Sequence, residues 1–262
     1  MIYGAIIGDM AGSEWEFHPC MKERPAEIIS KNSFFTDDTV MTIAVADAVM
    51  HGLPFADALR KWGMTHYRFK KGGYGARFIH WLFDPDMGPY NSCGNGSGMR
   101  VSPVAWVADS LEECIDLAAK SAEISHNHPE GIKGAVATAG ATYLARTGAP
   151  KAGIRAFLEV LGYDLSRSCD DIRPGYEHIE TCQESIPEAM TAFLESTSYA
   201  DCLELCISLG GDADTLCAIA GAVAEAFYGI PDDLIEKCRA MLPADMLAIV
   251  DEFESGSWRA KK

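Results

Sequence analysis

Two short clusters of oxygen-bearing side chains lie about 175 positions apart, and each comes directly before an apolar, alanine-rich segment. The first has the sequence TDDT at residues 36–39, and the second has the sequence GDADT at residues 211–215. One Asp or Thr at such a position is typical of a helix N-cap, which contributes about 1 kcal/mol. Capping alone does not account for paired carboxylates at two helix starts. Carboxylates that are buried together repel one another unless a cation neutralises them.

A metal site is the alternative to capping. Hard oxygen ligands from Asp and Thr, without clustered Cys or His, favour Mg²⁺ or Mn²⁺ over Zn²⁺. If the two clusters converge, their carboxylates and hydroxyls are enough for a two-metal centre. The residues alone leave capping and metal binding both open.

Helix-periodic, alanine-rich segments must position these clusters, and glycines at residues 52, 148 and 229 supply stop signals. Alternating apolar and polar runs are nearly absent, so we predict an all-α fold without a sheet. Three glycine-rich or polar segments, 71–75, 87–100 and 125–131, read as loops that could carry function. We expect helices over residues 2–12, 38–50, 54–65, 75–82, 102–108, 111–124, 130–146, 151–162, 186–195, 199–209, 214–227, 232–241 and 243–252.

Length and charge limit the class of protein. The chain has 262 residues and a formal net charge of −16, and we read residues 1–262 as a single domain, and as a monomer, with a frayed basic tail, SWRAKK. Such an acidic surface disfavours nucleic acid and anionic membranes. The nine scattered cysteines predict reduced thiols, and no signal peptide or membrane span is recognisable, so we expect a cytoplasmic protein.

The two clusters and two further segments together resemble the motifs of the ADP-ribosylglycohydrolase family. The segment GAIIGDMAGSEWE at residues 4–16 is similar to that family's first helix and following loop. The segment GNGSGMRVSP at residues 94–103 looks like its ligand-binding loop. The four motifs occur in the family's order and span residues 4–215. The resemblance implies a compact, single-domain orthogonal helical bundle with a binuclear Mg²⁺ or Mn²⁺ centre at the base of a cleft.

The resemblance also implies roles for individual residues. It assigns metal binding to Thr36, Asp37, Asp38, Asp212, Asp214 and Thr215. Glu16 matches a catalytic glutamate that lies beside the metals and the scissile bond. Contacts to the diphosphate and ribose of the ligand are implied for Ser92, Gly94, Asn95, Gly96 and His126.

The implied activity is hydrolysis of the glycosidic bond between ADP-ribose and its acceptor. This reaction needs a carboxyl group for proton transfer, and two cations can orient the ribose diol. The expected partner is a protein that carries mono-ADP-ribose, with arginine as the first choice of acceptor. Serine, poly(ADP-ribose) and a nucleic-acid base remain alternatives. A non-catalytic ADP-ribose-binding protein and a different metal-dependent hydrolase, such as a phosphohydrolase, also stay open.

Four further residues or pairs have simpler interpretations. We expect Asp9 to be structural and to bond to nearby backbone. Tyr90 could stack on adenine, and Arg100 should pair with a protein carboxylate because acidic partners are plentiful. The pair His126 and His128 is a weak metal signal, since Pro129 indicates a helix start directly after it.

Overall fold

The computed structural model describes residues 2–17 and 22–261, and its ordered elements are helices. The longer helices are α1 (Tyr3–Gly12), α2 (Asp37–His51), α3 (Phe55–Thr65), α4 (Ala76–Phe83), α7 (Leu111–Glu123), α8 (Pro129–Arg146), α9 (Lys151–Val160), α11 (Cys182–Glu195), α12 (Tyr199–Leu209), α13 (Ala213–Tyr228), α14 (Asp232–Met241) and α15 (Ala244–Ser255). The shorter ones are α5 (Gly96–Met99), α6 (Ser102–Val107), α10 (Cys169–Ile172) and a 3₁₀ helix, Ser257–Lys261. Within the described ranges the only β pairing is a single bridge between Gly94 and Thr181. The predicted all-α class is therefore confirmed.

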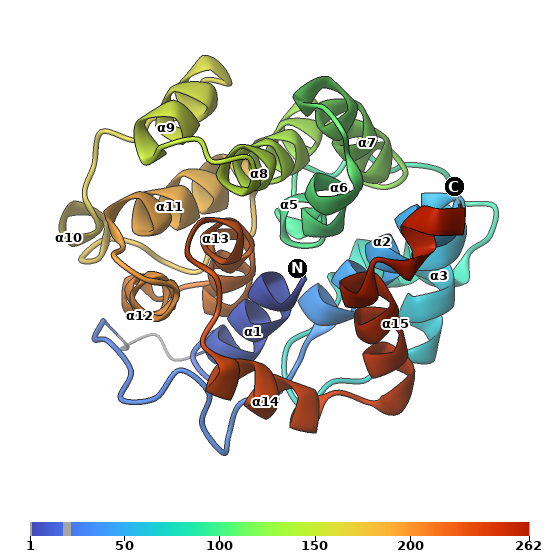
Figure 1. The fold of residues 1–262 in the computed structure, drawn as a ribbon, viewed down its shortest axis with the longest axis horizontal. Helices are drawn as coiled ribbons and strands as arrows, with labels where there is room; N and C mark the ends of the chain where they lie inside the picture. The colour runs from blue at the N-terminus through green and yellow to red at the C-terminus, as the bar shows by residue number, and fades with distance from the viewer. Residues whose placement is uncertain (1, 18–21, 262) are drawn as a thin grey trace.

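Helices α1 and α13 form the centre of the molecule and run antiparallel (Figure 1). Their backbones touch because α1 carries glycine at every fourth position. A Cβ atom built on Gly8 would lie 2.1 Å from the carbonyl oxygen of Cys217, and one on Gly12 would lie 2.3 Å from that of Ala213. Glycine at Gly4 has the same relation to Gly221. This packing brings the C-terminal end of α1 against the N-terminal end of α13.

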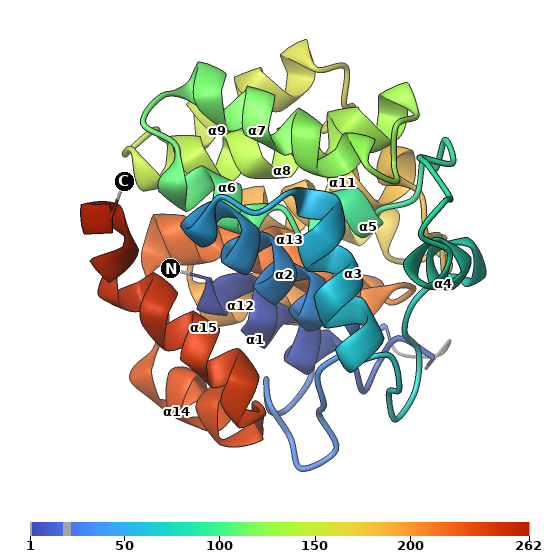
Figure 2. The same cartoon turned by 90° about the vertical axis from the view of Figure 1, so that its right-hand side faces the viewer.

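The other helices enclose this central pair. Helices α8, α11 and α12 pack against α13, whereas α2 packs against α1, α3 and α6. Figure 2 shows α7, α8 and α9 in a layer above α1, α2 and α13, with α14 and α15 at one end. The buried side chains of these elements form one continuous hydrophobic cluster. The rigid core thus holds the N-terminal ends of α2 and α13 in place.

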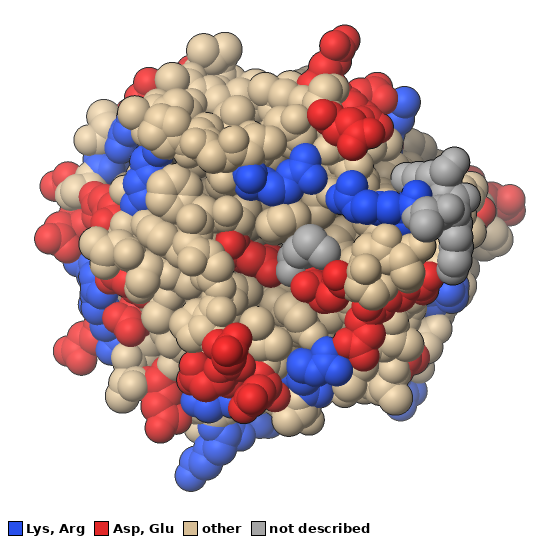
Figure 3. Space-filling view, in the orientation of Figure 1, with Lys and Arg blue, Asp and Glu red and all other residues tan. Residues whose placement is uncertain are grey.

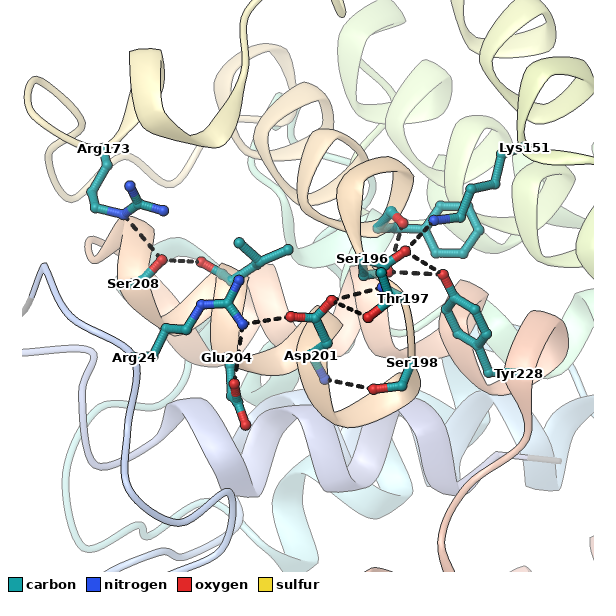
Figure 4. Close-up of polar contacts among 12 residues, drawn as sticks. Arg24, Lys151, Arg173, Ser196, Thr197, Ser198, Asp201, Glu204, Ser208 and Tyr228 are labelled. Carbon is teal, nitrogen blue, oxygen red and sulfur yellow. Dashed lines mark hydrogen bonds and ion pairs between the residues drawn. The ribbon is translucent and has the colours of Figure 1, made fainter.

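Ion pairs and hydrogen bonds from basic side chains hold surface segments against this core. Figure 4 shows Arg24, from the segment before α2, against Asp201 and Glu204 of α12. Lys151 donates to the carbonyl oxygen of Leu194 over 3.0 Å and also to that of Ser196. A cation at the C-terminal end of α11 complements the carbonyl groups that the helix leaves unpaired there.

Four sequence-based expectations need correction. Helices α5 and α10 have four residues each, which is too short for a periodic pattern to reveal. Helix α11 starts at Cys182 rather than residue 186, so Pro187 lies inside it. The tail is not frayed through residue 261, because Trp258 is 3% exposed and its indole N–H donates to the carbonyl oxygen of Phe253.

Charged side chains of both signs and free cysteine thiols occur within the described ranges. Lys and Arg side chains are interspersed with Asp and Glu on the face shown in Figure 3. The eight cysteines within the described ranges are free thiols, while Cys20 lies outside them. Among the described residues, no helix is long and apolar enough to cross a membrane.

Candidate active site

The two predicted carboxylate clusters meet at the C-terminal end of α1, and Asp9 joins them. Its carboxylate accepts hydrogen bonds from the backbone N–H of Thr36 over 2.8 Å and of Thr39 over 3.0 Å, which caps α2 from a neighbouring helix. The hydroxyl of Thr36 also donates to Asp9, and it lies 3.4 Å from a carboxylate oxygen of Asp38. Asp9 thus bonds to backbone, as the sequence predicted.

The carboxylates fall into two overlapping groups that could hold a metal ion. One consists of Asp9, Asp38 and Asp214, and the other of Glu16, Asp212 and Asp214. Within each group, one oxygen from every residue lies within 4.8 Å of the others. Asp214 is shared by both groups, so the arrangement is a continuous acidic cluster across α1, α2 and α13. Asp37 and Thr215 line a cavity beside this cluster.

The carboxylates of this cluster are crowded and poorly solvated. Burial first, and then repulsion from neighbouring carboxylates, raises the pKa of Asp37, Asp38 and Asp214 well above the ordinary value. One oxygen of Asp38 is buried and has no hydrogen-bond partner. Hard, closely spaced oxygen donors of this kind fit a divalent cation such as Mg²⁺ or Mn²⁺, which would neutralise them. The donor set therefore fits a divalent cation, which was the alternative to helix capping.

A cavity of about 380 Å³ opens beside the cluster. Four helices begin at its wall, namely α2, α4, α5 and α13, so the positive ends of their dipoles lie close to the carboxylates. The predicted site residues that line it are Glu16, Asp37, Asp38, Ser92, Gly94, Asn95, Gly96, His126, Asp212, Asp214 and Thr215. Thr36 does not line the cavity. Its hydroxyl donates to Asp9 and lies beside Asp38, both of which belong to the acidic cluster.

Glu16 lies one turn beyond the end of α1 and is half-buried. Its backbone N–H donates to the carbonyl oxygen of Gly12 over 3.2 Å. Burial first, and then the nearby charge of Asp212, raises the pKa of Glu16 to about 7. Its Oε2 atom is buried without a hydrogen-bond partner, beneath Gly72. A Cβ atom on Gly72 would lie 2.6 Å from that oxygen, so a side chain there would displace the Glu16 carboxyl, and the φ of +64° also favours glycine.

The glycine-rich loop, residues 94–96, ends at the first residue of α5 and also lines the cavity. Its Asn95 side chain donates to a carboxylate oxygen of Asp212 over 2.6 Å and to the hydroxyl of Ser185 over 3.0 Å. Asn95 therefore orients Asp212. A Cβ atom on Gly96 would lie 3.2 Å from Nε2 of His126, which places that ring nitrogen directly over the loop.

His126 and Tyr90 lie side by side in the cavity wall, with ring centroids 6.1 Å apart. His128 does not join a metal site with His126, because its Nδ1 accepts the backbone N–H of Glu130 and caps α8. The prediction for Arg100 was wrong. Its guanidinium is buried and donates to the carbonyl oxygen of Ser121 and the hydroxyl of Ser125, and no described carboxylate forms an ion pair with it.

Sequence reasoning missed parts of the wall. Gly73 and residues 75–78, which include Arg77 at the start of α4, line the cavity together with Glu180. The adjacent glycines of the KGGYG stretch marked a loop, but nothing in the sequence placed that loop against Glu16. Asp9 was expected to be structural only, and its place within the acidic cluster was not foreseen.

An all-α fold and an acidic cavity are the features that the resemblance to the ADP-ribosylglycohydrolases implied. The family model described as ADP-ribosylglycohydrolase matches residues 1–261, so the chain belongs to that family. A solved structure titled "ADP-ribosylglycohydrolase-related protein complex" covers 95% of this chain and 93% of its own, with a TM-score of 0.71 and 23% identity. That similarity concerns the fold.

Characterised relatives are similar over most of their length. The chain is 25% identical to ADP-ribosylhydrolase ARH3 of Homo sapiens, covering 94% of this chain and 90% of the relative. It is 24% identical to ARH3 of Mus musculus, covering 94% and 88%. It is also 26% identical to the ADP-ribosylarginine hydrolase Tri1 of Pseudomonas putida, covering 90% and 72%.

Proposed function

We propose that this protein is a metal-dependent hydrolase that removes mono-ADP-ribose from protein side chains. The observation that carries the proposal is the acidic cluster of Glu16, Asp38, Asp212 and Asp214 at the base of a cavity with a glycine-rich wall. Family membership supports the glycosidic bond of ADP-ribose as the bond that is cleaved.

Two divalent cations, Mg²⁺ or Mn²⁺, are the proposed cofactors. The two overlapping carboxylate groups and the unpaired oxygen of Asp38 support two adjacent ions. Their ligands would come from Thr36, Asp37, Asp38, Asp212, Asp214 and Thr215. When bound, the ions supply positive charge that offsets the carboxylates and attracts the oxygens of an anionic ligand.

Glu16 is the proposed proton-transfer group. Hydrolysis adds the hydroxyl of water to C1″ of the ribose and a proton to the departing acceptor atom. The Glu16 carboxyl lies in the cavity within the same group as Asp212 and Asp214, so it can deliver or accept that proton beside the ions. In the metal-free protein, burial and the charge of Asp212 raise the pKa of Glu16 to about 7, and a proton carrier is most effective near the working pH.

The glycine-rich loop and His126 are the proposed ligand contacts. Backbone N–H groups can approach a diphosphate closely where glycine leaves no Cβ atom in the way. Gly94 and Gly96 line the cavity, and the Ser92 hydroxyl, which accepts the N–H of Gly94 over 3.1 Å, keeps its own proton for the ligand. Tyr90, in the same wall, is the proposed contact to the adenine.

Arginine is the first choice of acceptor. The relative Tri1 is named an ADP-ribosylarginine hydrolase, which supports this choice. Matches to ARH3 of several vertebrates, at similar identity, keep other acceptors in view. A non-catalytic role on the same fold is the second candidate, but the complete carboxylate set disfavours it.

The test is incubation of the protein and Mg²⁺ with peptides that carry ADP-ribose on arginine or on serine. We expect release of free ADP-ribose, fastest from arginine, and no release of phosphate. Phosphate as the product would show a phosphohydrolase, and tight ADP-ribose binding without any release would show a binding protein.

Metal content provides an independent check. Asp37→Ala and Asp214→Ala should lose bound Mg²⁺ or Mn²⁺ with little loss of helix content, whereas Asp109→Ala, on the surface before α7, should keep it. Unchanged metal content in both cluster variants would contradict the two-metal centre.

A further inference from the structure

Arg100 is a buried positive charge without a counter-charge. Its side chain is 1% exposed and lies in the wall of the active-site cavity. The guanidinium lies over the ring of Phe78 at 5.7 Å, and its Nε atom has no hydrogen-bond partner. Among the described residues, no carboxylate lies within ion-pair distance. An unpaired buried charge is unfavourable, so an anionic ligand in this cavity would offset it.

Arg100 reaches the cavity through two further side chains. One guanidinium nitrogen donates to the hydroxyl of Ser125 over 3.0 Å. The Ser125 oxygen lies 2.8 Å from Nδ1 of His126. The opposite ring nitrogen, Nε2, lies 3.2 Å and 3.6 Å from the Cβ positions of Gly96 and Gly94. The three side chains therefore form a hydrogen-bonded line that ends over the glycine-rich loop.

The direction of these hydrogen bonds follows from donor and acceptor capacity. Arginine can only donate, so the Ser125 oxygen is the acceptor in the first contact. The Ser125 hydroxyl proton then has one described acceptor, which is Nδ1 of His126. The reverse arrangement would leave a buried hydroxyl proton without an acceptor, which is rare in native structures. Nδ1 is therefore unprotonated, and the ring proton is on Nε2.

The charge state of the ring agrees with this direction. Burial first, and then repulsion from Arg100, lowers the pKa of His126 well below its ordinary value. The imidazole is thus neutral at physiological pH and offers a single N–H donor.

We propose that Arg100 and Ser125 are positioning residues, which hold His126 in the Nε2–H tautomer so that it donates a hydrogen bond to an anionic oxygen of the ligand. This inference rests on the proposed ADP-ribose function for the identity of that ligand, and the tautomer itself does not depend on it. The hydrogen bonds from Arg100 through Ser125 to His126, called the relay below, connect the buried guanidinium to the glycine-rich loop.

The first test is nitrogen NMR of the histidine side chains in the metal-free and Mg²⁺-loaded parent protein, with His126→Gln used to assign the signal. We expect Nδ1 of His126 to be unprotonated and Nε2 to carry the proton. A proton on Nδ1, or a doubly protonated ring at pH 7.5, would overturn the relay. This measurement needs no variant of the relay to fold.

The second test is calorimetric titration of ADP-ribose into Mg²⁺-loaded variants. Ser125→Ala and Arg100→Met should each weaken affinity by roughly tenfold or more, the loss expected when a buried hydrogen-bonding chain is broken. The matched control is Arg146→Met, because Arg146 also donates to backbone carbonyls and lies over a tyrosine ring, but outside the cavity. It should bind as the parent does.

The outcomes separate the relay from the function. Parent-like affinity in both relay variants would overturn the inference even if the enzyme is active. Absence of ADP-ribose binding by the parent would overturn the proposed function and the ligand contact together. Binding without hydrolysis would remove the catalytic proposal and leave the relay standing.

Discussion

A substitution of Glu16 can distinguish a role in proton transfer from a role in binding. It lies in the carboxylate group with Asp212 and Asp214, yet one of its oxygens has no hydrogen-bond partner. We predict that Glu16→Gln keeps ADP-ribose binding and bound metal but slows hydrolysis by about a hundredfold or more, the usual effect of losing proton-transfer catalysis. Single-turnover release of ADP-ribose measures this.

The control for Glu16 is its neighbour Glu14, which hydrogen-bonds Ser30 and Asn32 and does not line the cavity. Glu14→Gln should retain near-parental activity. If Glu16→Gln is also within a few-fold of the parent, Glu16 takes no part in the chemistry.

Gly96 tests the glycine-rich loop at the same scale. A Cβ atom there would meet the ring of His126 at 3.2 Å and project into the ligand space. Gly96→Val should weaken ADP-ribose binding by more than about 1.4 kcal/mol, or tenfold, and leave metal content unchanged. In the same segment, a side chain on Gly88 meets nothing within 4 Å, so Gly88→Val is the matched control. Equal affinities of the two variants, measured by calorimetry, would place the diphosphate elsewhere.

Asp47 connects helix α2 to helix α3 through buried hydrogen bonds. It is a 3%-exposed carboxylate in α2 that accepts from the indole N–H of Trp62 and the amine of Lys61, both in α3, over 2.8 Å each. His51 contacts it from within α2, also at 2.8 Å. Burial alone would raise the pKa of Asp47, but these hydrogen bonds outweigh burial and lower it.

We predict that Asp47→Ala destabilises the protein by about 2 kcal/mol or more, because it leaves a buried indole N–H unpaired. The folded-state pKa of Asp47 is depressed, so its stabilisation is present above about pH 4 and is lost as the pH falls through the folded value. Urea unfolding should therefore show a large difference at pH 7 that shrinks below pH 4. Lys61→Met removes a mostly exposed partner and should cost less than about 1 kcal/mol. A similar loss in both variants would assign the effect to the ion pair instead.

Helices were predictable wherever their signals are local. The bounds of α12 and α14 follow from periodicity and from flanking Ser198 and Pro231. Helix α11 was placed one turn late because Pro187 is typical of a helix start. Its extra turn is held from outside, where the N–H of Cys182 donates to the carbonyl oxygen of Cys93. No local pattern encodes such a contact.

The candidate site was predictable in its residue types but not in its assembly. The motifs around Asp37 and Asp214 indicated carboxylate clusters, and the structure brings them together. Their convergence depends on the close approach of α1 and α13 along Gly4, Gly8 and Gly12, and this glycine spacing does not identify the partner helix. Arg100 was misjudged because overall charge says nothing about which partners reach a buried position.

The acidic cluster has a consequence for the stability of the whole molecule. In the metal-free protein, the pKa of Asp9 is raised to about 6 and that of Glu16 to about 7, mainly by burial, compared with ordinary values near 4. The folded state therefore binds more protons than the unfolded state between about pH 4 and pH 7. Stability contributed by protonation is present below pH 4 and is lost as the pH rises through the folded values.

We accordingly predict that, in EDTA, the free energy of unfolding attributable to this cluster falls as the pH rises from 4 to 7. Saturating Mg²⁺ should remove that fall, because cations favour the ionised carboxylates. Thermal unfolding across this range, with and without Mg²⁺ at constant ionic strength, measures both. We also expect one cooperative transition, as residues 1–262 are predicted to be one domain. A metal-free pH profile identical to the Mg²⁺ profile would show that the cluster binds no cation.

Asp38→Asn gives the sharpest form of this prediction, because its two effects have opposite signs. The carboxylate of Asp38 is buried, one of its oxygens is unpaired, and its pKa is raised by burial and by Asp9 and Asp37. Replacing it with a neutral amide removes that repulsion, so the metal-free variant should be more stable than the metal-free parent at pH 7. The same change removes a proposed metal ligand. Mg²⁺ at about one hundred times its dissociation constant would stabilise the parent by about 2.7 kcal/mol, but it should hardly change the stability of the variant.

Capping of α2 does not confuse the result, since Thr36 and Asp9 make the cap. Loss of stability in the metal-free variant would mean that Asp38 is a structural residue, and an undiminished response to Mg²⁺ would mean that the ions bind elsewhere.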